Sequence, residues 1–277
     1  MSAASGTFVA DLSGLVVRFR GLDEPLAGHL AAAWAPFSAR PDATPWLDVE
    51  LECLSDPIAT DRPMRPSVTG EVREGSARFR SDEGRLVLDA QGLARVALGR
   101  GDARWRYWGL LNLIAAAVAV RLPSRPGALL HGAGIVLDDR AFVLIGPEGT
   151  GKSTFAQKAK EGGARVIGDD AVIVDGMGGG LSLLGSPVRA HEATQPGPGR
   201  WPVAAVLHAR RGSTPRLDVV GRLAIEALVT ANLPFLASGW GHDARLDALV
   251  PYLATAAPHR ALTFAPDSSF VEVLRAF

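Results

Sequence analysis

The stretch that decides the fold is Ala141-Phe-Val-Leu-Ile145, followed directly by Gly146-Pro-Glu-Gly-Thr-Gly-Lys-Ser153. The first five residues are all apolar, which is typical of a strand in the centre of a sheet that is covered on both faces. The next eight residues match the pattern G-x-x-x-x-G-K-[ST] at every fixed position. A helix is expected over 154–161, so the motif lies between a strand and a helix, the context that gives the pattern its meaning.

The chemistry of this motif is phosphate binding. Glycines let the backbone N–H groups of residues 148–153 converge on phosphate oxygens, and the following helix adds the positive end of its dipole. Lys152 is expected to be exposed and to reach the β- and γ-phosphates of ATP, while the Ser153 hydroxyl binds Mg²⁺. A chance glycine-rich turn is the alternative. The expected nucleotide contacts are Gly146, Glu148, Gly149, Thr150, Gly151, Lys152, Ser153 and Thr154.

Two adjacent carboxylates, Asp169 and Asp170, follow the next short strand, 165–167. Ligands of an open α/β sheet bind at the carboxyl ends of its strands, so both carboxylates are expected at the phosphate site. One can bind Mg²⁺ while the other takes a proton from an attacking hydroxyl. We expect Asp170 to bind the metal together with Ser153, and Asp169 to face His131 and act as the base. The alternative is a turn capped by its aspartate side chains.

His131 lies in the apolar run Leu129-Leu-His-Gly-Ala-Gly134. Strands over 128–137 and 141–145 are expected to pair as a hairpin, which places His131 near the start of the glycine motif. The imidazole can then orient or polarise the acidic base. The alternative is a core histidine whose polar atoms are satisfied by its neighbours.

Together, His131-Gly, Gly146-x-x-Gly-x-Gly-Lys-Ser153 and Asp169-Asp170 resemble the catalytic domain of HPr kinase/phosphorylase. The sequence resembles more specifically the HPr-kinase-related proteins of biosynthetic clusters for modified peptides, lasso-peptide clusters among them. The motifs cover about residues 126–176. The resemblance implies an α/β fold akin to phosphoenolpyruvate carboxykinase and ATP- and Mg²⁺-dependent phosphoryl transfer to a serine hydroxyl. It also implies catalytic roles for His131, Lys152, Asp169 and Asp170.

The sequence also departs from that family. Glu148 stands where HPr kinases usually have serine, and the glycine- and arginine-containing C-terminal signature of the bifunctional enzymes is absent. HPr itself as the substrate, and the phosphorylase reaction, are therefore not carried over. The segment 185–191 could supply Arg189 to the phosphates, although an exposed loop charge is the better explanation of that residue.

Composition excludes several classes of protein. The chain has 277 residues, 47% of them hydrophobic, with 29 basic and 29 acidic side chains, so it can form a core and lacks the excess of basic residues typical of nucleic-acid binding. The apolar stretch 110–120 is about half the length of a membrane span, and no secretory signal is visible. We therefore expect a cytoplasmic protein with no membrane and no nucleic acid as partner. Cys53, the single cysteine, is expected to be a buried structural thiol.

The chain is expected to form a β-rich N-terminal domain over 1–103 and a P-loop catalytic domain over 104–277. In the first, a helix should begin after Asp23 and strands should cover 7–10, 14–19, 47–51, 77–80, 85–89 and 93–98. A helix over 105–120 is apolar nearly all round and should be buried. Further helices are expected over 221–232 and 243–256, with Pro251 breaking or kinking the last.

The function expected from these residues is an ATP- and Mg²⁺-dependent kinase acting on a hydroxyl group, with a serine of a peptide or small protein as the first choice of acceptor. A small-molecule kinase and a nucleotide hydrolase fit the same residues. A non-catalytic module that senses nucleotide or binds peptide is the alternative from another class. The oligomeric state stays open, a homo-oligomer included.

Overall fold

The computed structural model describes residues 6–57, 68–73, 76–188, 194, 197–234 and 244–277. The protein is a mixed α/β chain with two sheets, and it divides into two compact units. The first unit contains the described residues up to Arg121, and the second begins at Leu122. Sequence reasoning placed this boundary at 103/104. The difference arises because the helix α2 (Ala103–Arg121) packs against the strands of the first sheet.

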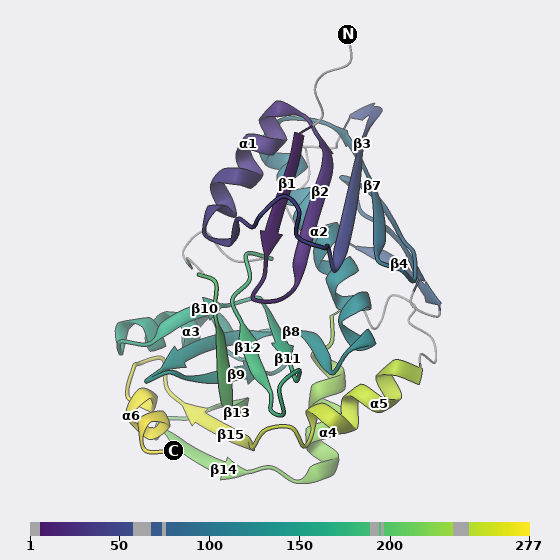
Figure 1. The fold of residues 1–277 in the computed structure, drawn as a ribbon. Helices are drawn as coiled ribbons and strands as arrows, with labels where there is room; N and C mark the ends of the chain where they lie inside the picture. The colour runs from purple at the N-terminus through teal and green to yellow at the C-terminus, as the bar shows by residue number, and fades with distance from the viewer. Residues whose placement is uncertain (1–5, 58–67, 74–75, 189–193, 195–196, 235–243) are drawn as a thin grey trace. The chain divides into compact units, whose positions relative to one another are not determined.

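The first unit is built on a seven-stranded sheet with the order β1-β2-β3-β7-β6-β5-β4 (Figure 1). Every strand expected from the alternating pattern is present. The strands are β1 (Gly6–Asp11), β2 (Val16–Leu22), β3 (Leu47–Pro57), β4 (Thr69–Arg73), β5 (Ser76–Arg80), β6 (Gly84–Leu88) and β7 (Leu93–Arg100).

Two helices cover this sheet. The helix α1 (Glu24–Ala33) begins where predicted, because the Asp23 side chain accepts a hydrogen bond of 3.1 Å from the Leu26 N–H. It is followed by a 3₁₀ turn, η1 (Ala35–Phe37). In α2 every residue from Gly109 to Val120 is buried. Among the described residues, the stretch 103–124 is long and apolar enough to cross a membrane by length and composition, but 72% of its window is buried. The expectation of a buried core helix is confirmed.

Cys53 corrects a prediction, because its side chain is exposed rather than buried. It lies in the second half of β3, where its neighbour Glu52 is exposed as well. Successive side chains of a strand point to opposite faces, so neither face of the strand is covered at this point. Alternation in the sequence identifies the strand but does not show where the covering layer ends.

The second unit contains an eight-stranded mixed sheet. The pairings β8–β11, β11–β12, β12–β13, β13–β9 and β9–β8 form a closed circuit, because the long strands β8 and β13 each pair with different neighbours along their length. The strands are β8 (Gly127–Leu137), β9 (Arg140–Ile145), β10 (Arg165–Gly168), β11 (Ala171–Asp175), β12 (Ser182–Leu184), β13 (Arg200–Arg211), β14 (Arg216–Val219) and β15 (His259–Phe264).

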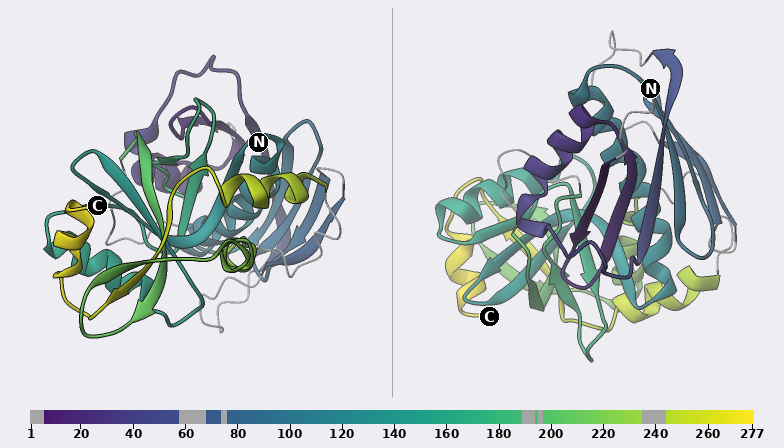
Figure 2. Two further views of the ribbon diagram at one scale, coloured as in Figure 1. Left: turned by 90° about the horizontal axis from the view of Figure 1, so that it is seen from below. Right: turned by 45° about the horizontal axis from the view of Figure 1, so that its top comes forward.

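Helices cover the strand β9 from both sides, as its apolar sequence predicts (Figure 2). Ala141, Val143 and Ile145 face the cluster that includes α4 (Arg222–Ala231) and α5 (Ala244–Leu253). Phe142 and Leu144 face the cluster that includes α3 (Lys152–Glu161) and α6 (Phe270–Arg275). A 3₁₀ turn, η2 (Leu122–Ser124), precedes β8. Pro251 lies inside α5, and the helix continues for two residues beyond it before ending at Leu253.

The hairpin between β8 and β9 is present as predicted. Gly132 lies opposite Ile145, and Leu137 lies opposite Arg140. The turn residues Asp138 and Asp139 both have positive φ angles, 50° and 59°. Two successive left-handed residues produce the turn whose twist matches that of the flanking strands, and aspartate tolerates this conformation. The hairpin fixes His131 just beyond the end of β9.

Candidate active site

The strand–loop–helix unit predicted from the glycine motif is present. The strand β9 ends at Ile145 and α3 begins at Lys152. Gly149 and Gly151 have φ angles of +76° and +99°, a conformation that residues with a Cβ rarely adopt. Gly151 precedes the first turn of α3, and no side chain caps that turn. The backbone N–H groups at the start of α3 can therefore serve an anion.

Lys152 is buried, only 7% exposed, where exposure was expected. Its Nζ donates hydrogen bonds of 2.7 Å to the Gly146 carbonyl and 3.0 Å to the Pro147 carbonyl. Burial lowers the pKa of Lys152, and the negative charges of Asp170 and Glu148 oppose that shift. An ammonium has three N–H donors, so one is left for a phosphate oxygen. Lys152 therefore holds the loop as well as offering a charge to a ligand.

Asn232 fixes the start of the loop, and sequence reasoning missed it. This residue follows α4 and is 2% exposed. Its Oδ1 accepts from the Gly146 N–H at 3.1 Å, and its Nδ2 donates to the Leu228 carbonyl at 2.7 Å. Its backbone carbonyl accepts from the His131 N–H at 2.7 Å. An asparagine just after a helix is a common local feature, so the sequence contains no sign of this role.

Two further contacts hold the middle of the loop. The Thr150 hydroxyl donates to the Pro147 carbonyl at 2.7 Å. The Arg211 guanidinium donates to the Gly149 carbonyl. Arg211 is the last residue of β13, the strand that runs parallel to β9, so its side chain starts at the same end of the sheet as the loop. Arg211 was also missed by sequence reasoning, because only the pairing of β13 with β9 brings it there.

His131 contacts Asp170, where the sequence predicted Asp169. Its Nδ1 lies 2.9 Å from the Asp170 backbone oxygen and 3.3 Å from the Asp170 Oδ1. Both neighbours are acceptors, so Nδ1 carries the proton and donates it to them. The register decides the partner: Ala171 lies opposite His131, and the preceding residue Asp170 accepts from the Gly132 N–H at 3.1 Å.

The oxygen donors at this end of the sheet fit Mg²⁺. Ser153 is exposed in the first turn of α3, and Asp169 and Asp170 are both partly exposed where β10 meets β11. Among the described residues, no group of three or more His, Cys, Asp or Glu side chains forms a metal cage. Mg²⁺ bound with a nucleotide needs none, because one or two carboxylates suffice beside phosphates and waters.

A buried histidine pair lies in the sheet beside β9. His208 is paired with Ile145, the residue just before the loop, and His259 lies on β15. The His208 Nε2 is 2.8 Å from the His259 Nδ1, and the His259 Nε2 is 3.0 Å from the Leu253 carbonyl. The carbonyl can only accept, so His259 donates from Nε2 and His208 donates to His259. Burial, reinforced by the charges of His259 and Arg210, lowers the pKa of His208 to about 4.

The predicted site residues are therefore gathered largely as expected. The loop residues 146–154, His131 and Asp170 belong to elements that meet at one end of the second sheet, and Asp170 and Glu148 are close enough to act on the charge of Lys152. Asp169 adjoins them in sequence but is not the partner of His131. The candidate Arg189 lies outside the described residues.

Comparison with known proteins adds one weak structural likeness. No protein-family model matches the chain, and no curated protein matches it. Among solved structures, the HPr(Ser) kinase/phosphatase from Coxiella burnetii is similar over 53% of this chain and 90% of its own, with 10% sequence identity and a TM-score of 0.32. At these values the likeness is weak and assigns no function to this chain.

Proposed function

We propose that the second unit binds ATP with Mg²⁺ and transfers the terminal phosphoryl group to a hydroxyl, with a serine of a peptide or small protein as the acceptor. One observation carries this proposal: a glycine loop with a buried lysine lies at the same end of the sheet as an Asp170–His131 contact. We also propose that this unit has the HPr-kinase-like P-loop fold that the motif string resembles.

Phosphate recognition is supported by the loop geometry. The left-handed glycines and the uncapped start of α3 leave backbone N–H groups for phosphate oxygens. Lys152 has one N–H left after its two loop contacts, and its charge can balance the β- and γ-phosphates. Asn232 accepts from the Gly146 N–H, and Lys152 holds the Gly146 and Pro147 carbonyls, so the protein itself holds the start of the loop in place. An ordered site loses less conformational entropy on binding.

Proton transfer is assigned to Asp170 because His131 contacts this carboxylate. The acceptor oxygen attacks the γ-phosphorus, the bond to the β–γ bridging oxygen breaks, and ADP leaves with its electron pair. The acceptor's proton goes to the Asp170 carboxylate, which His131 holds through its Nδ1–H. Bound Mg²⁺ would supply charge neutralisation of the phosphates, and Ser153 and Asp169 are the residues that would hold it. This exchanges the two aspartate roles expected from the sequence.

The test is an acceptor panel with radiolabelled Mg²⁺–ATP. The full chain is incubated with serine- and threonine-containing peptides, with small polyols, or with water alone, and labelled product is measured together with free phosphate. We expect label on a peptide hydroxyl, abolished in Lys152→Met and retained in Lys160→Met, a matched change on the exposed side of the same helix.

The other outcomes separate the rival functions. Label on polyols alone would make the protein a small-molecule kinase, and free phosphate without labelled acceptor would make it a hydrolase. Nucleotide binding with no turnover towards any acceptor would identify a sensing module. Absence of ATP binding by calorimetry would refute the proposal altogether. We also propose a cytoplasmic location, because a protein that uses ATP must be where ATP is present.

A further inference from the structure

Three arginines crowd together on the exposed face of the first sheet. Arg80 on β5 lies directly opposite Arg85 on β6, and Arg78 lies opposite Val87, one step along the same two strands. Like charges that face each other across two strands are destabilising. The three side chains are exposed, and they make no ion pair with any residue in the described part of the chain.

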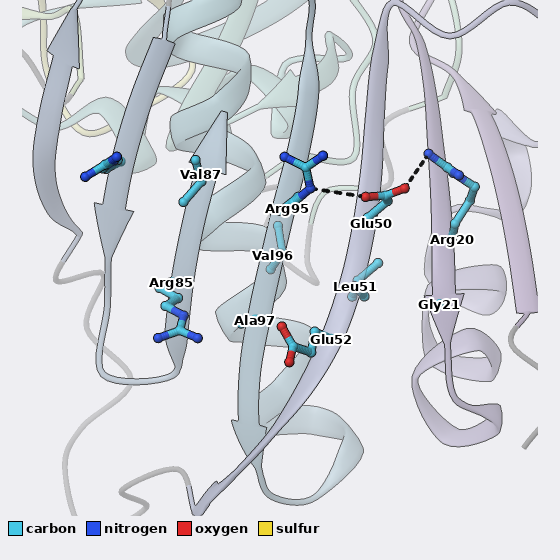
Figure 3. A pocket seen from close by; sticks show the side chains of 11 residues that line it. Arg20, Gly21, Glu50, Leu51, Glu52, Arg85, Val87, Arg95, Val96 and Ala97 are labelled. Carbon is cyan, nitrogen blue, oxygen red and sulfur yellow. Dashed lines mark ion pairs between the residues drawn. The ribbon is translucent and has the colours of Figure 1, made fainter. Parts of the chain in front are cut away.

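The neighbouring strands differ, because their charges are paired. Glu50 on β3 is 2.9 Å from Arg20 and 3.5 Å from Arg95 (Figure 3). Asp48 likewise accepts from both Arg18 and Arg20. Asp48 and Glu50 are thus each shared between two guanidinium groups. On the other side of the cluster, Glu71 on β4 lies opposite Arg78, but its ion pair is with Arg73 at 3.2 Å. The arginine cluster, defined as Arg78, Arg80 and Arg85, therefore carries three positive charges, none of which is in an ion pair with a carboxylate of the described residues.

The surface beside the cluster is hollow. A depression of about 860 Å³ extends over β2, β3, β7, β6 and β5, and Arg78 and Arg85 line it. Val87, which is 43% exposed, lies opposite Arg78 and two residues along β6 from Arg85, and it offers an apolar contact. None of the residues that line the depression is aromatic, and Glu50 and Glu52 lie at its β3 side. Single-stranded nucleic acid prefers aromatic stacking and avoids carboxylates, so a polynucleotide fits poorly here.

We propose that the arginine cluster binds an extended acidic polypeptide segment. Arg78 and Arg80 are two residues apart on one strand, about 7 Å along it, which is the spacing of alternate side chains in an extended peptide. A segment with carboxylates at positions i and i+2, lying along β5, meets both of them, and a third carboxylate reaches Arg85. An apolar side chain of the same segment packs on Val87. This site lies wholly within the first unit and does not depend on the phosphoryl-transfer proposal.

The test measures binding of a fluorescein-labelled peptide of twelve residues with glutamate at alternate positions. Anisotropy is recorded with the full chain at low and at physiological salt. The variant Arg78→Gln/Arg80→Gln/Arg85→Gln is compared with Arg216→Gln/Arg222→Gln/Arg275→Gln, which removes the same charge from exposed positions of the second unit. We expect about tenfold weaker binding in the first variant, the sum of three weak ion pairs, and less than a twofold change in the second. Added salt should weaken native binding.

The melting temperature supplies an independent reading. Removing a repulsive pair should leave the melting temperature of the cluster variant equal to that of the native chain or raise it. A clear fall would show that the arginines support the fold, and would overturn the proposal. Absence of peptide binding, or equal binding by both variants, would do the same. So would tighter binding of a twelve-residue oligothymidylate with the same dependence on the cluster, because the site would then serve phosphates.

Discussion

The ion pairs on the sheet face of the first unit and the polar side chains near the glycine loop of the second unit differ in their burial. In the first unit the ion pairs of Asp48 and Glu50 lie on a partly exposed sheet face. In the second unit Lys152, Asn232 and the pair of histidines at 208 and 259 are buried around the loop. Exposed ion pairs contribute less than about 1 kcal/mol, whereas a buried polar group that loses its partner costs more. Substitutions should therefore have large effects near the loop and small effects on the sheet face.

The largest effect is expected at Lys152. Lys152→Met should reduce the proposed phosphoryl transfer by at least about 10²–10³-fold, because it removes the charge that we propose binds the phosphates. It should also lower the melting temperature, since the ammonium holds the Gly146 and Pro147 carbonyls. Lys152→Arg should not restore activity, because a planar guanidinium does not replace a compact ammonium. Full activity in either variant would remove the phosphate-binding assignment of the loop.

The next effect concerns the two aspartates. Asp170→Asn should lower kcat by about 10²–10⁴-fold with nucleotide affinity nearly unchanged, because the proposed general base is lost. Asp169→Asn should instead raise the Mg²⁺ concentration needed for half-maximal rate. Asp139→Asn, in the β8–β9 turn, is the matched control. If the two effects are exchanged, Asp169 is the base, as the sequence predicted. If neither variant differs from native, the pair is only a turn.

The buried histidine pair predicts a pH effect on stability. The pKa of His208 falls from 6.5 in the unfolded chain to about 4 in the folded one, so the unfolded state binds the proton more readily between these values. The contribution of neutral His208 to the free energy of unfolding is therefore fully present above pH 6.5 and should decline as the pH falls towards 4. The total loss should reach about 3 kcal/mol, at 1.36 kcal/mol per pKa unit. Urea unfolding between pH 7.5 and 4.5 measures this slope. An identical slope in His208→Leu would contradict the assignment.

A smaller effect is expected at His131. His131→Ala should lower kcat about tenfold and alter one limb of the pH–rate profile, because the group that orients Asp170 is removed. The melting temperature should change little, since the side chain is 40% exposed. His131→Gln, which keeps a donor, should recover part of the rate without restoring the limb. A lowered melting temperature with unchanged kcat would make His131 a structural residue only.

The smallest effect is expected on the sheet face. Hydrogen bonding from Arg18 lowers the pKa of Asp48 below 3.8, opposed by burial and assisted by Arg20. The ion pair therefore contributes in full above pH 3.8 and is lost as the pH falls through the folded pKa. Asp48→Asn should cost less than about 1 kcal/mol at pH 7, and less still near pH 3. A loss of unfolding free energy comparable to that expected from the histidine pair would contradict the expected difference between the exposed sheet face and the buried residues near the loop.

The sequence by itself determined the local features of this protein. The apolar run of β9, the glycine motif, the Asp23 cap of α1 and the turn at Asp138 all formed where predicted. Each depends on interactions between residues a few positions apart, which a sequence pattern records directly. The buried helix α2 was predicted for the same reason, because its apolar residues occur all round.

Only the tertiary structure decided which distant residues meet. The register of β11 against β8 places His131 in contact with Asp170. The position of α4 places Asn232 within hydrogen-bond distance of Gly146 in the loop. The extent of the covering layer left Cys53 exposed, while the folding of the loop onto its own lysine buried Lys152. These outcomes depend on strand register and packing between segments far apart in the chain, and no local pattern specifies them.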